Sequence, residues 1–200
     1  PEDFGIVGVL LAFTGIVSLT ASFKYELAIV LEKNSKRLRH LINLNFILIF
    51  LVCVLLLIIS FFADSIIPLL NLDEKLIEIF HYSILIVFFS ALYNVYSNRF
   101  NREKKYNQIA YFQIIRKVVL VVFQILFGYI FASALGLVLG HVLSVLISVF
   151  FIIIFFGKKF PFLYKFDFGK IINQAKRYYK FPLYTFPQSL VNLFSAHLPV

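Results

Sequence analysis

The sequence lacks several residue types and the motifs of common soluble enzymes. Its 200 residues include no Met, no Trp and a single Cys, Cys53, so no disulfide can form within the chain. Cys and His spacings typical of a metal site are absent, as are a phosphate-binding glycine loop and a nucleophile elbow. We therefore expect no catalytic residue, no metal and no cofactor, and the chain is predicted not to be an enzyme.

Charged residues are scarce and apolar residues are abundant. Charged residues make up 14% of the chain and hydrophobic residues 61%, compared with about 45–50% hydrophobic residues in ordinary soluble domains. A soluble core of this size cannot hide so much apolar surface, but a bilayer can. The chain starts at Pro1, contains no Met and ends in an apolar run at Val200, so we expect an internal part of a longer membrane protein.

The basic residues form three clusters that apolar segments separate. All of the 19 Lys and Arg residues except Lys75 belong to these clusters. Two apolar runs lie between successive clusters, and an even number of crossings returns a chain to the same side of a membrane. The pattern is therefore positive-inside, with the clusters in the cytoplasm, and the net charge of +9 indicates orientation, with no binding of nucleic acid. The clusters are Lys24, Lys33, Lys36, Arg37 and Arg39; Arg99, Arg102, Lys104, Lys105, Arg116 and Lys117; and Lys158, Lys159, Lys165, Lys170, Lys176, Arg177 and Lys180.

The apolar segments predict an all-α fold, a polytopic bundle of transmembrane helices. The segment 118–156 carries no charge and as one helix would be nearly twice the about 30 Å of the hydrocarbon core. It must turn back, and Ser133 and Gly136 are the best turn residues. The stretch 64–75 is predicted to be a loop, and a sixth helix begins near Phe181. About five full spans are predicted, within 5–23 (with an extension to 31 left open), 41–63, 76–96 and the two halves of 118–156.

The third basic cluster includes a predicted amphipathic helix. From Phe168 onward, apolar residues recur on one face and basic or amide residues on the other, and Asp167 can cap its N-terminus. Such a helix suits the surface of an anionic cytoplasmic leaflet. The alternative is a solvated helix packed on its neighbours.

Polar residues within the spans are the candidates for a binding site. If the fourth span begins near Ile109, Arg116 lies one or two turns inside the membrane, where a charge needs a wet cavity or a partner. The polar residues either line a hydrophilic chamber or form hydrogen bonds between helices, and Arg116 could instead reach the interface by snorkelling. The candidate residues for a substrate cavity are Lys24, Tyr25, Glu26, Asn94, Gln113, Arg116, Gln124 and His141.

Several short motifs follow one another along almost the whole chain. They are Pro1–Gly5 (PEDFG), Phe23–Ile29 (FKYELAI), Arg99 with Lys104–Ala110 (KKYNQIA), Gly136–Gly140 (GLVLG), Tyr179–Leu183 (YKFPL) and Pro187–Asn192 (PQSLVN). In order and spacing they resemble the polysaccharide flippases of the O-antigen type, within the multidrug/oligosaccharidyl-lipid/polysaccharide exporter superfamily.

This resemblance implies helices two to seven of a two-lobed transporter. Residues 1–156 would be first-lobe helices, 157–180 a cytoplasmic amphipathic linker, and 181–200 the start of the second lobe. The family moves an undecaprenyl-pyrophosphate-linked oligosaccharide across the inner membrane, from the cytoplasmic to the periplasmic leaflet, by alternating access. The implied partners are the lipid-linked oligosaccharide, membrane lipids and other polysaccharide assembly proteins.

Three other functions remain open from the sequence, one of which is a non-catalytic membrane scaffold. A cation-coupled multidrug exporter of the same superfamily would need an intramembrane carboxylate, for which Glu26 and Glu78 are the nearest candidates. A membrane enzyme of polysaccharide assembly would need a long outward loop with catalytic residues, and the predicted outward segments are short.

The basic clusters predict the topology. Cysteines introduced at Ser35, Asn101 and Lys170 should react with an impermeant thiol reagent from the cytoplasmic side, and one at Asn71 from the outside. Labelling in intact and permeabilised cells measures this. Labelling of Asn101 and Asn71 from the same face would contradict the topology.

Overall fold

Apolar segments in a bilayer become helices because no water is present there to bond the backbone. The computed structural model describes residues 2–69, 73–131, 133–156 and 167–197. Among them, five helical segments are long and apolar enough to span a membrane, and the fold is the all-α bundle that the sequence predicts. The elements are α1 Glu2–Thr20, α2 Tyr25–Leu31, α3 Ser35–Phe61, α4 Ala63–Leu69, α5 Lys75–Phe80, α6 Tyr82–Arg102, α7 Tyr106–Phe131, α8 Ala134–Phe156, α9 Phe168–Arg177, a π-helical turn Phe181–Thr185 and α10 Phe186–His197.

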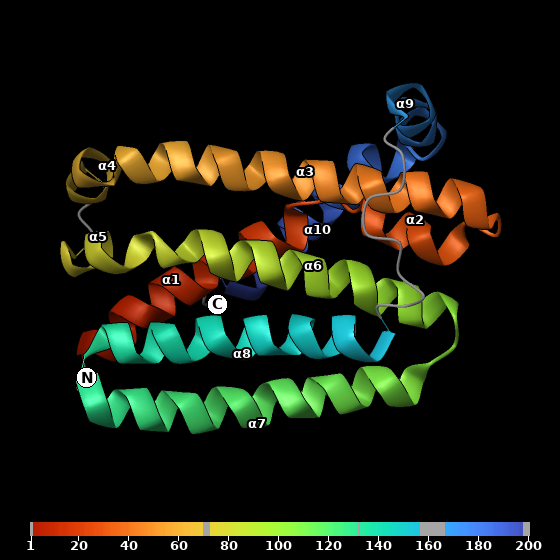
Figure 1. The fold of residues 1–200 in the computed structure, drawn as a ribbon. Coiled ribbons are helices and arrows are strands. Elements are labelled where there is room, and N and C mark those ends of the chain that lie inside the picture. Colours follow the sequence, from red (N-terminus) through yellow and green to blue (C-terminus); the bar gives the residue numbers. More distant parts are fainter. Residues whose placement is uncertain (1, 70–72, 132, 157–166, 198–200) are drawn as a thin grey trace.

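The long helices lie side by side (Figure 1). From top to bottom the view shows α3, α6, α8 and α7, and α1 crosses obliquely behind α6 and α8. One apolar cluster joins α2, α3 and α6 around the buried Ile29, Leu41 and Val87. A second cluster joins α1, α5 and α8 around Leu10 and Val138. α7 stands at the edge of the bundle.

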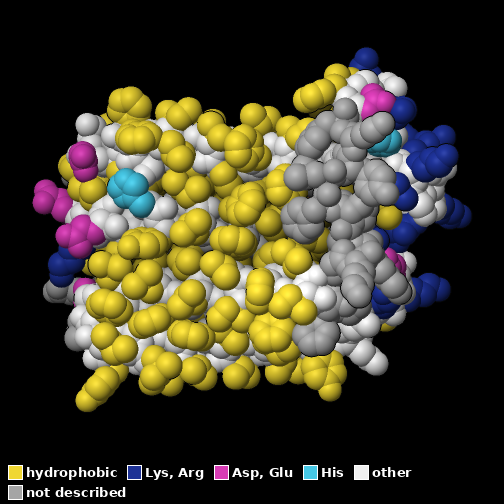
Figure 2. Space-filling model, in the orientation of Figure 1, with side chains coloured by type: hydrophobic (Ala, Val, Ile, Leu, Met, Phe, Trp, Pro, Cys, Tyr) yellow, Lys and Arg dark blue, Asp and Glu magenta, His cyan; other side chains and the backbone are white. Residues whose placement is uncertain are grey.

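The charges gather at the two ends of the bundle (Figure 2). Hydrophobic side chains cover its length, and most basic side chains lie at the end that contains the start of α3, the α6–α7 turn and α9. Lys75 begins α5, which lies at the opposite end (Figure 1), and its Nζ is 3.8 Å from Asp3 Oδ1. For the described residues this segregation agrees with the predicted clusters, although Arg116 and Lys117 lie inside α7. Lys158, Lys159 and Lys165 of the third cluster lie outside the described residues.

Two segments differ from the sequence-based expectation. The first half of the expected loop 64–75 is helical, because Ala63 and Ile67, one turn apart in α4, are both buried in the second apolar cluster. The first span does not continue straight to residue 31. Instead α1 ends at Thr20, and the break before α2 places Phe23 and Lys24 in the left-handed region, with φ of 50° and 64°. Asn71, used in the topology prediction, lies outside the described residues.

The α7–α8 hairpin is held together by close backbone approach. Ser133 lies in the turn, as predicted, but Gly136 belongs to α8 rather than to the turn. A Cβ atom at Gly140 would lie 2.8 Å from the backbone nitrogen of Gln124, and one at Gly136 would clash with the carbonyl oxygen of Phe127. The pair forms a Gly-x-x-x-Gly motif, whose small residues let two membrane helices approach closely.

Substitution of Gly140 should therefore destabilise the hairpin. Gly140→Ala should lower the stability of the purified protein by about 1–3 kcal/mol, as overpacking does elsewhere, and reduce its thermal unfolding temperature in detergent. The matched control is Gly15→Ala in α1, because a Cβ atom there meets nothing within 4 Å. Equal unfolding temperatures for Gly140→Ala and the wild type would contradict this role of the glycine.

Candidate functional site

A cavity of about 660 Å³ lies where α7 faces α6 and α8. Gln113, Arg116 and Lys117 reach it from α7, Tyr93 from α6 and His141 from α8. Residues three and four apart share one face of a helix, which is why the α7 residues meet there. His141 directly follows Gly140, whose lack of a side chain lets α8 approach α7 at this height. Three of the predicted candidates, Gln113, Arg116 and His141, are thus brought together.

Arg116 lies well inside its helix. It is ten residues beyond the start of α7, which places it about 15 Å along the helix axis. The centre of its guanidinium is 5.1 Å from the centroid of the Tyr93 ring, a cation–π geometry. One guanidinium nitrogen is 3.5 Å from the Ser90 hydroxyl oxygen, at the long limit of a hydrogen bond. These contacts hold the side chain but leave its charge without a counter-ion in the part of the chain that the structure describes.

The lining of this cavity is cationic. The described residues that line it include Arg116 and Lys117 and no Asp or Glu. Two buried polar atoms that belong to lining residues, the Tyr93 hydroxyl oxygen and His141 Nδ1, have no hydrogen-bond partner among the described residues. Both atoms can donate to an anion, and buried polar atoms are normally paired. The arrangement can accept an anionic group inside the membrane.

Lys24, Tyr25 and Glu26 lie elsewhere, at the break between α1 and α2. The Tyr25 hydroxyl donates to the backbone carbonyl of Ala175 in α9 at 3.1 Å. The Glu26 side chain is 5% exposed and accepts a hydrogen bond from the Ser22 hydroxyl. The cavity around Arg116 does not include Lys24 among its lining residues.

The two remaining candidates also lie outside the Arg116 cavity. Gln124 lines a separate cavity of about 480 Å³, together with Asp3 and Ser133. Asn94 is partly buried in α6, and its backbone carbonyl accepts from the Asn98 side chain at 3.0 Å.

Several of the buried Ser and Thr side chains bond within their own helices. Thr14 and Ser18 are buried and donate to carbonyls one turn earlier in α1. Ser144 and Ser148 do the same in α8. Sequence reasoning missed Tyr93 because an aromatic residue in an apolar span looks like packing. Its spacing of three from Ser90, a polar residue of the same helix, is the signal that could have found it.

A hydrogen-bond network at the basic end fixes the segments around α9. Arg102 donates through Nε to the Glu32 carbonyl at 2.7 Å and through a terminal nitrogen to the Lys33 carbonyl at 3.0 Å. The Tyr178 hydroxyl donates to the Glu32 carboxylate at 3.1 Å. Beyond α6, burial would raise the pKa of Glu103, but hydrogen bonds from Lys105 and Arg99 lower it overall. This network joins α2, α3, α6 and the end of α9.

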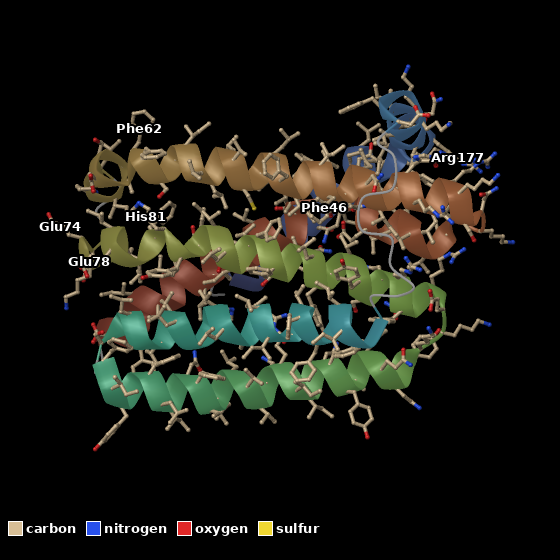
Figure 3. The ribbon with its side chains drawn as sticks, in the orientation of Figure 1. Phe46, Phe62, Glu74, Glu78, His81 and Arg177 are labelled. Carbon is tan, nitrogen blue, oxygen red and sulfur yellow. The ribbon has the colours of Figure 1, made fainter. Side chains whose placement is uncertain are left out.

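Carboxylates suited to ion coupling are few in the described part of the chain. Glu78 is exposed, and Figure 3 shows it with Glu74 and His81 at the end opposite Arg177. Glu26 is the buried one of the two carboxylates named from the sequence. Among the described residues, no group of three or more His, Cys, Asp or Glu side chains could hold a metal ion.

The comparisons with known proteins identify the family. A family model described as "polysaccharide biosynthesis protein" matches residues 1–199. The chain belongs to this family. Neither the curated proteins nor the solved structures include a significant match. The family assignment agrees with the predicted role in polysaccharide biosynthesis, and together with the five apolar helices it indicates a membrane protein of that process.

Proposed function

We propose that the chain is part of a flippase for an undecaprenyl-pyrophosphate-linked oligosaccharide. The substrate would cross the inner membrane from the cytoplasmic to the periplasmic leaflet during surface polysaccharide synthesis. The observation that carries this proposal is the cationic cavity around Arg116, within a membrane span of a polysaccharide biosynthesis protein. The chain would bind and move its substrate without covalent chemistry.

The cavity has the groups that a lipid-linked pyrophosphate requires. Arg116 can hold two phosphate oxygens through its planar guanidinium, whereas Lys117 supplies a point charge. The free hydroxyl of Tyr93 and Nδ1 of His141 can donate to the remaining oxygens. The rest of the lining is largely apolar, with residues such as Ile114, Val118 and Leu120, and suits the adjoining lipid.

The exposure of α7 supports a transport role for this groove. Along its whole length α7 buries a single side chain, Phe112. Away from its contact with α8, many α7 side chains are exposed and can meet lipid or a second lobe. In the proposed domain organisation residues 1–156 form the first lobe, 157–180 the linker and 181–200 the start of the second lobe. α10 would then be the first helix of the second lobe, and it meets the α1–α2 break through a contact of the Phe23 and Phe186 rings, 5.0 Å between centroids.

Lys24 belongs to this proposal through its place at that break. It precedes α2 directly and follows Phe23, so it lies where the proposed second lobe begins. Lys24 would then lie at the border of a chamber between the two lobes. We therefore propose Lys24 as a second contact for the anionic head of the substrate, in addition to Arg116.

Replacement of Arg116 tests the site. Arg116→Ala should abolish surface polysaccharide, whereas Arg116→Lys should retain part of it. Lys keeps the positive charge but cannot form the bidentate hydrogen bonds that Arg makes with phosphate. Surface glycan is measured by immunoblot at equal protein levels in the membrane. Normal glycan in both Arg116→Ala and Lys24→Ala would mean that these residues anchor the helices at the interface and that the site assignment is wrong.

A cation-coupled multidrug exporter is the second candidate, favoured by the buried Glu26. A carboxylate with 5% exposure next to Lys24 is the type of group that could exchange a proton or Na⁺.

Glu26→Gln separates the two functions. If the protein were such an exporter, the change should abolish drug efflux driven by an ion gradient, because the amide cannot release a proton. Efflux of a fluorescent cation from cells is measured with and without the variant. We expect no efflux with either protein, and efflux that depends on Glu26 would favour the exporter over the flippase.

A further inference from the structure

A second cationic cavity lies at the basic end of the bundle (Figure 2), between the first turns of α3 and the helix α9. Its volume is about 420 Å³. Lys36, Arg37 and His40 line it from α3, and Lys170, Gln174 and Arg177 line it from α9. It shares no lining residue with the Arg116 cavity. The two walls come from parts of the chain more than a hundred residues apart, and the fold brings them together.

The charges around this cavity are largely uncompensated. Lys170 pairs with Asp167, with 2.7 Å between Nζ and Oδ2, and hydrogen bonds from Lys170 lower the pKa of Asp167. Lys36, Arg37 and Arg177 have no ion pair among the described residues. Like charges that folding brings together repel each other, and an anion between them removes that cost.

The start of α3 increases the positive potential. Its first turn contains no acidic residue, and cations at a helix N-terminus oppose the macrodipole. The Asn34 side chain already caps the backbone N–H groups of Lys36 and Arg37, at 2.9 and 3.3 Å. An anion in this cavity would therefore be held by side chains. Basic residues in the first turn of a helix are unfavourable, and such unfavourable placements are expected where a function requires them.

Two unpaired polar groups in the wall also point to a ligand. Gln174 is 7% exposed, and its Oε1 has no hydrogen-bond partner among the described residues. His40 Nδ1 is likewise unpaired. The two ends of the Gln amide can be exchanged by rotation, which presents its NH₂ group, and the ring nitrogen of His can carry a proton. Both groups can then donate to the same anion as the basic side chains.

We propose that this cavity binds a phosphate group, and that the phosphate joins the linker helix α9 to α3 of the first lobe. Two guanidinium groups and two lysines provide the charge-assisted hydrogen bonds that phosphate favours. The site goes beyond the proposed transport function, and only the description of α9 as a linker between lobes rests on the domain organisation proposed above. It would fasten the segment between the two lobes by a ligand from outside the chain.

An anionic lipid headgroup is the favoured source of the phosphate. Phe168 and Ile172 on α9 are 67% and 52% exposed, next to the basic cavity. Figure 2 shows hydrophobic side chains on the side of α9 that faces the apolar length of the bundle. A ligand with a phosphate and an acyl chain matches both features. Free inorganic phosphate shares the chemistry and is distinguished by the experiment.

The test measures lipid binding by the full protein in detergent. Short-chain phosphatidylglycerol is titrated and bound lipid is counted by native mass spectrometry, with diacylglycerol as the phosphate-free probe. Arg37→Gln with Arg177→Gln should weaken phosphatidylglycerol binding by about tenfold or more, from the loss of two charge-assisted contacts. Lys33→Gln with Lys176→Gln removes the same charge from nearby positions that do not line the cavity, and binding should stay within about twofold.

Each outcome of this experiment either supports or overturns the proposed phosphate site. Displacement of the lipid by millimolar inorganic phosphate assigns the site to phosphate alone, and no displacement assigns it to the lipid; both support phosphate recognition. Equal weakening in the two double variants, or unchanged binding in Arg37→Gln with Arg177→Gln, overturns the proposal. If that double variant does not fold, the single exposed substitution Arg177→Gln replaces it, with Lys176→Gln as its control.

Discussion

The exclusion of uncompensated charge from the hydrocarbon region governs the organisation of this chain. It explains why the described Lys and Arg residues lie mostly at one end of the bundle, and why the sides of the long helices are apolar. The same constraint gives Arg116 its significance. A guanidinium deep in α7, with an aromatic ring and a hydroxyl but no carboxylate among its described neighbours, is stable only beside water or an anion. The candidate cavity follows from that requirement.

The two cationic cavities use the same chemistry at different depths. The inner one combines Arg116 with unpaired donors on α6 and α8, and the outer one combines Arg37 and Arg177 with unpaired groups on α3 and α9. Their surroundings differ. The inner cavity lies within the spanning helices, whereas the outer one lies beside a network in which Arg102, Glu32 and Tyr178 fix the basic end. The proposed substrate site and the proposed anchoring site are therefore physically separate.

The sequence was sufficient for the features that depend on composition. The lengths of the apolar runs predicted the spans, and the basic clusters predicted which helix ends lie at the same end of the bundle. Asp167 was correctly identified as the N-cap of α9. The sequence was insufficient for the features that depend on tertiary contacts. The burial of Ala63 and Ile67 made a helix of an expected loop, and consecutive left-handed residues at Phe23 and Lys24 ended α1 early. The sequence predicted Gln113, Arg116 and Gln124 as cavity candidates, but it could not show that Gln124 lines another cavity, or that Tyr93 is a neighbour of Arg116.

The close contact of α7 and α8 has a consequence for the biogenesis of the protein. After Lys117 the chain contains no charge until it has completed both helices, and the short turn at Ser133 allows them to pair at once. A pair whose backbones meet at Gly136 and Gly140 can pack as soon as its second helix is made, beside the helices that precede it in the chain. Such a pair can leave the translocon as one helical hairpin, with both of its ends on the same side of the bilayer. The order of synthesis would then itself fix the orientation of the hairpin in the bilayer.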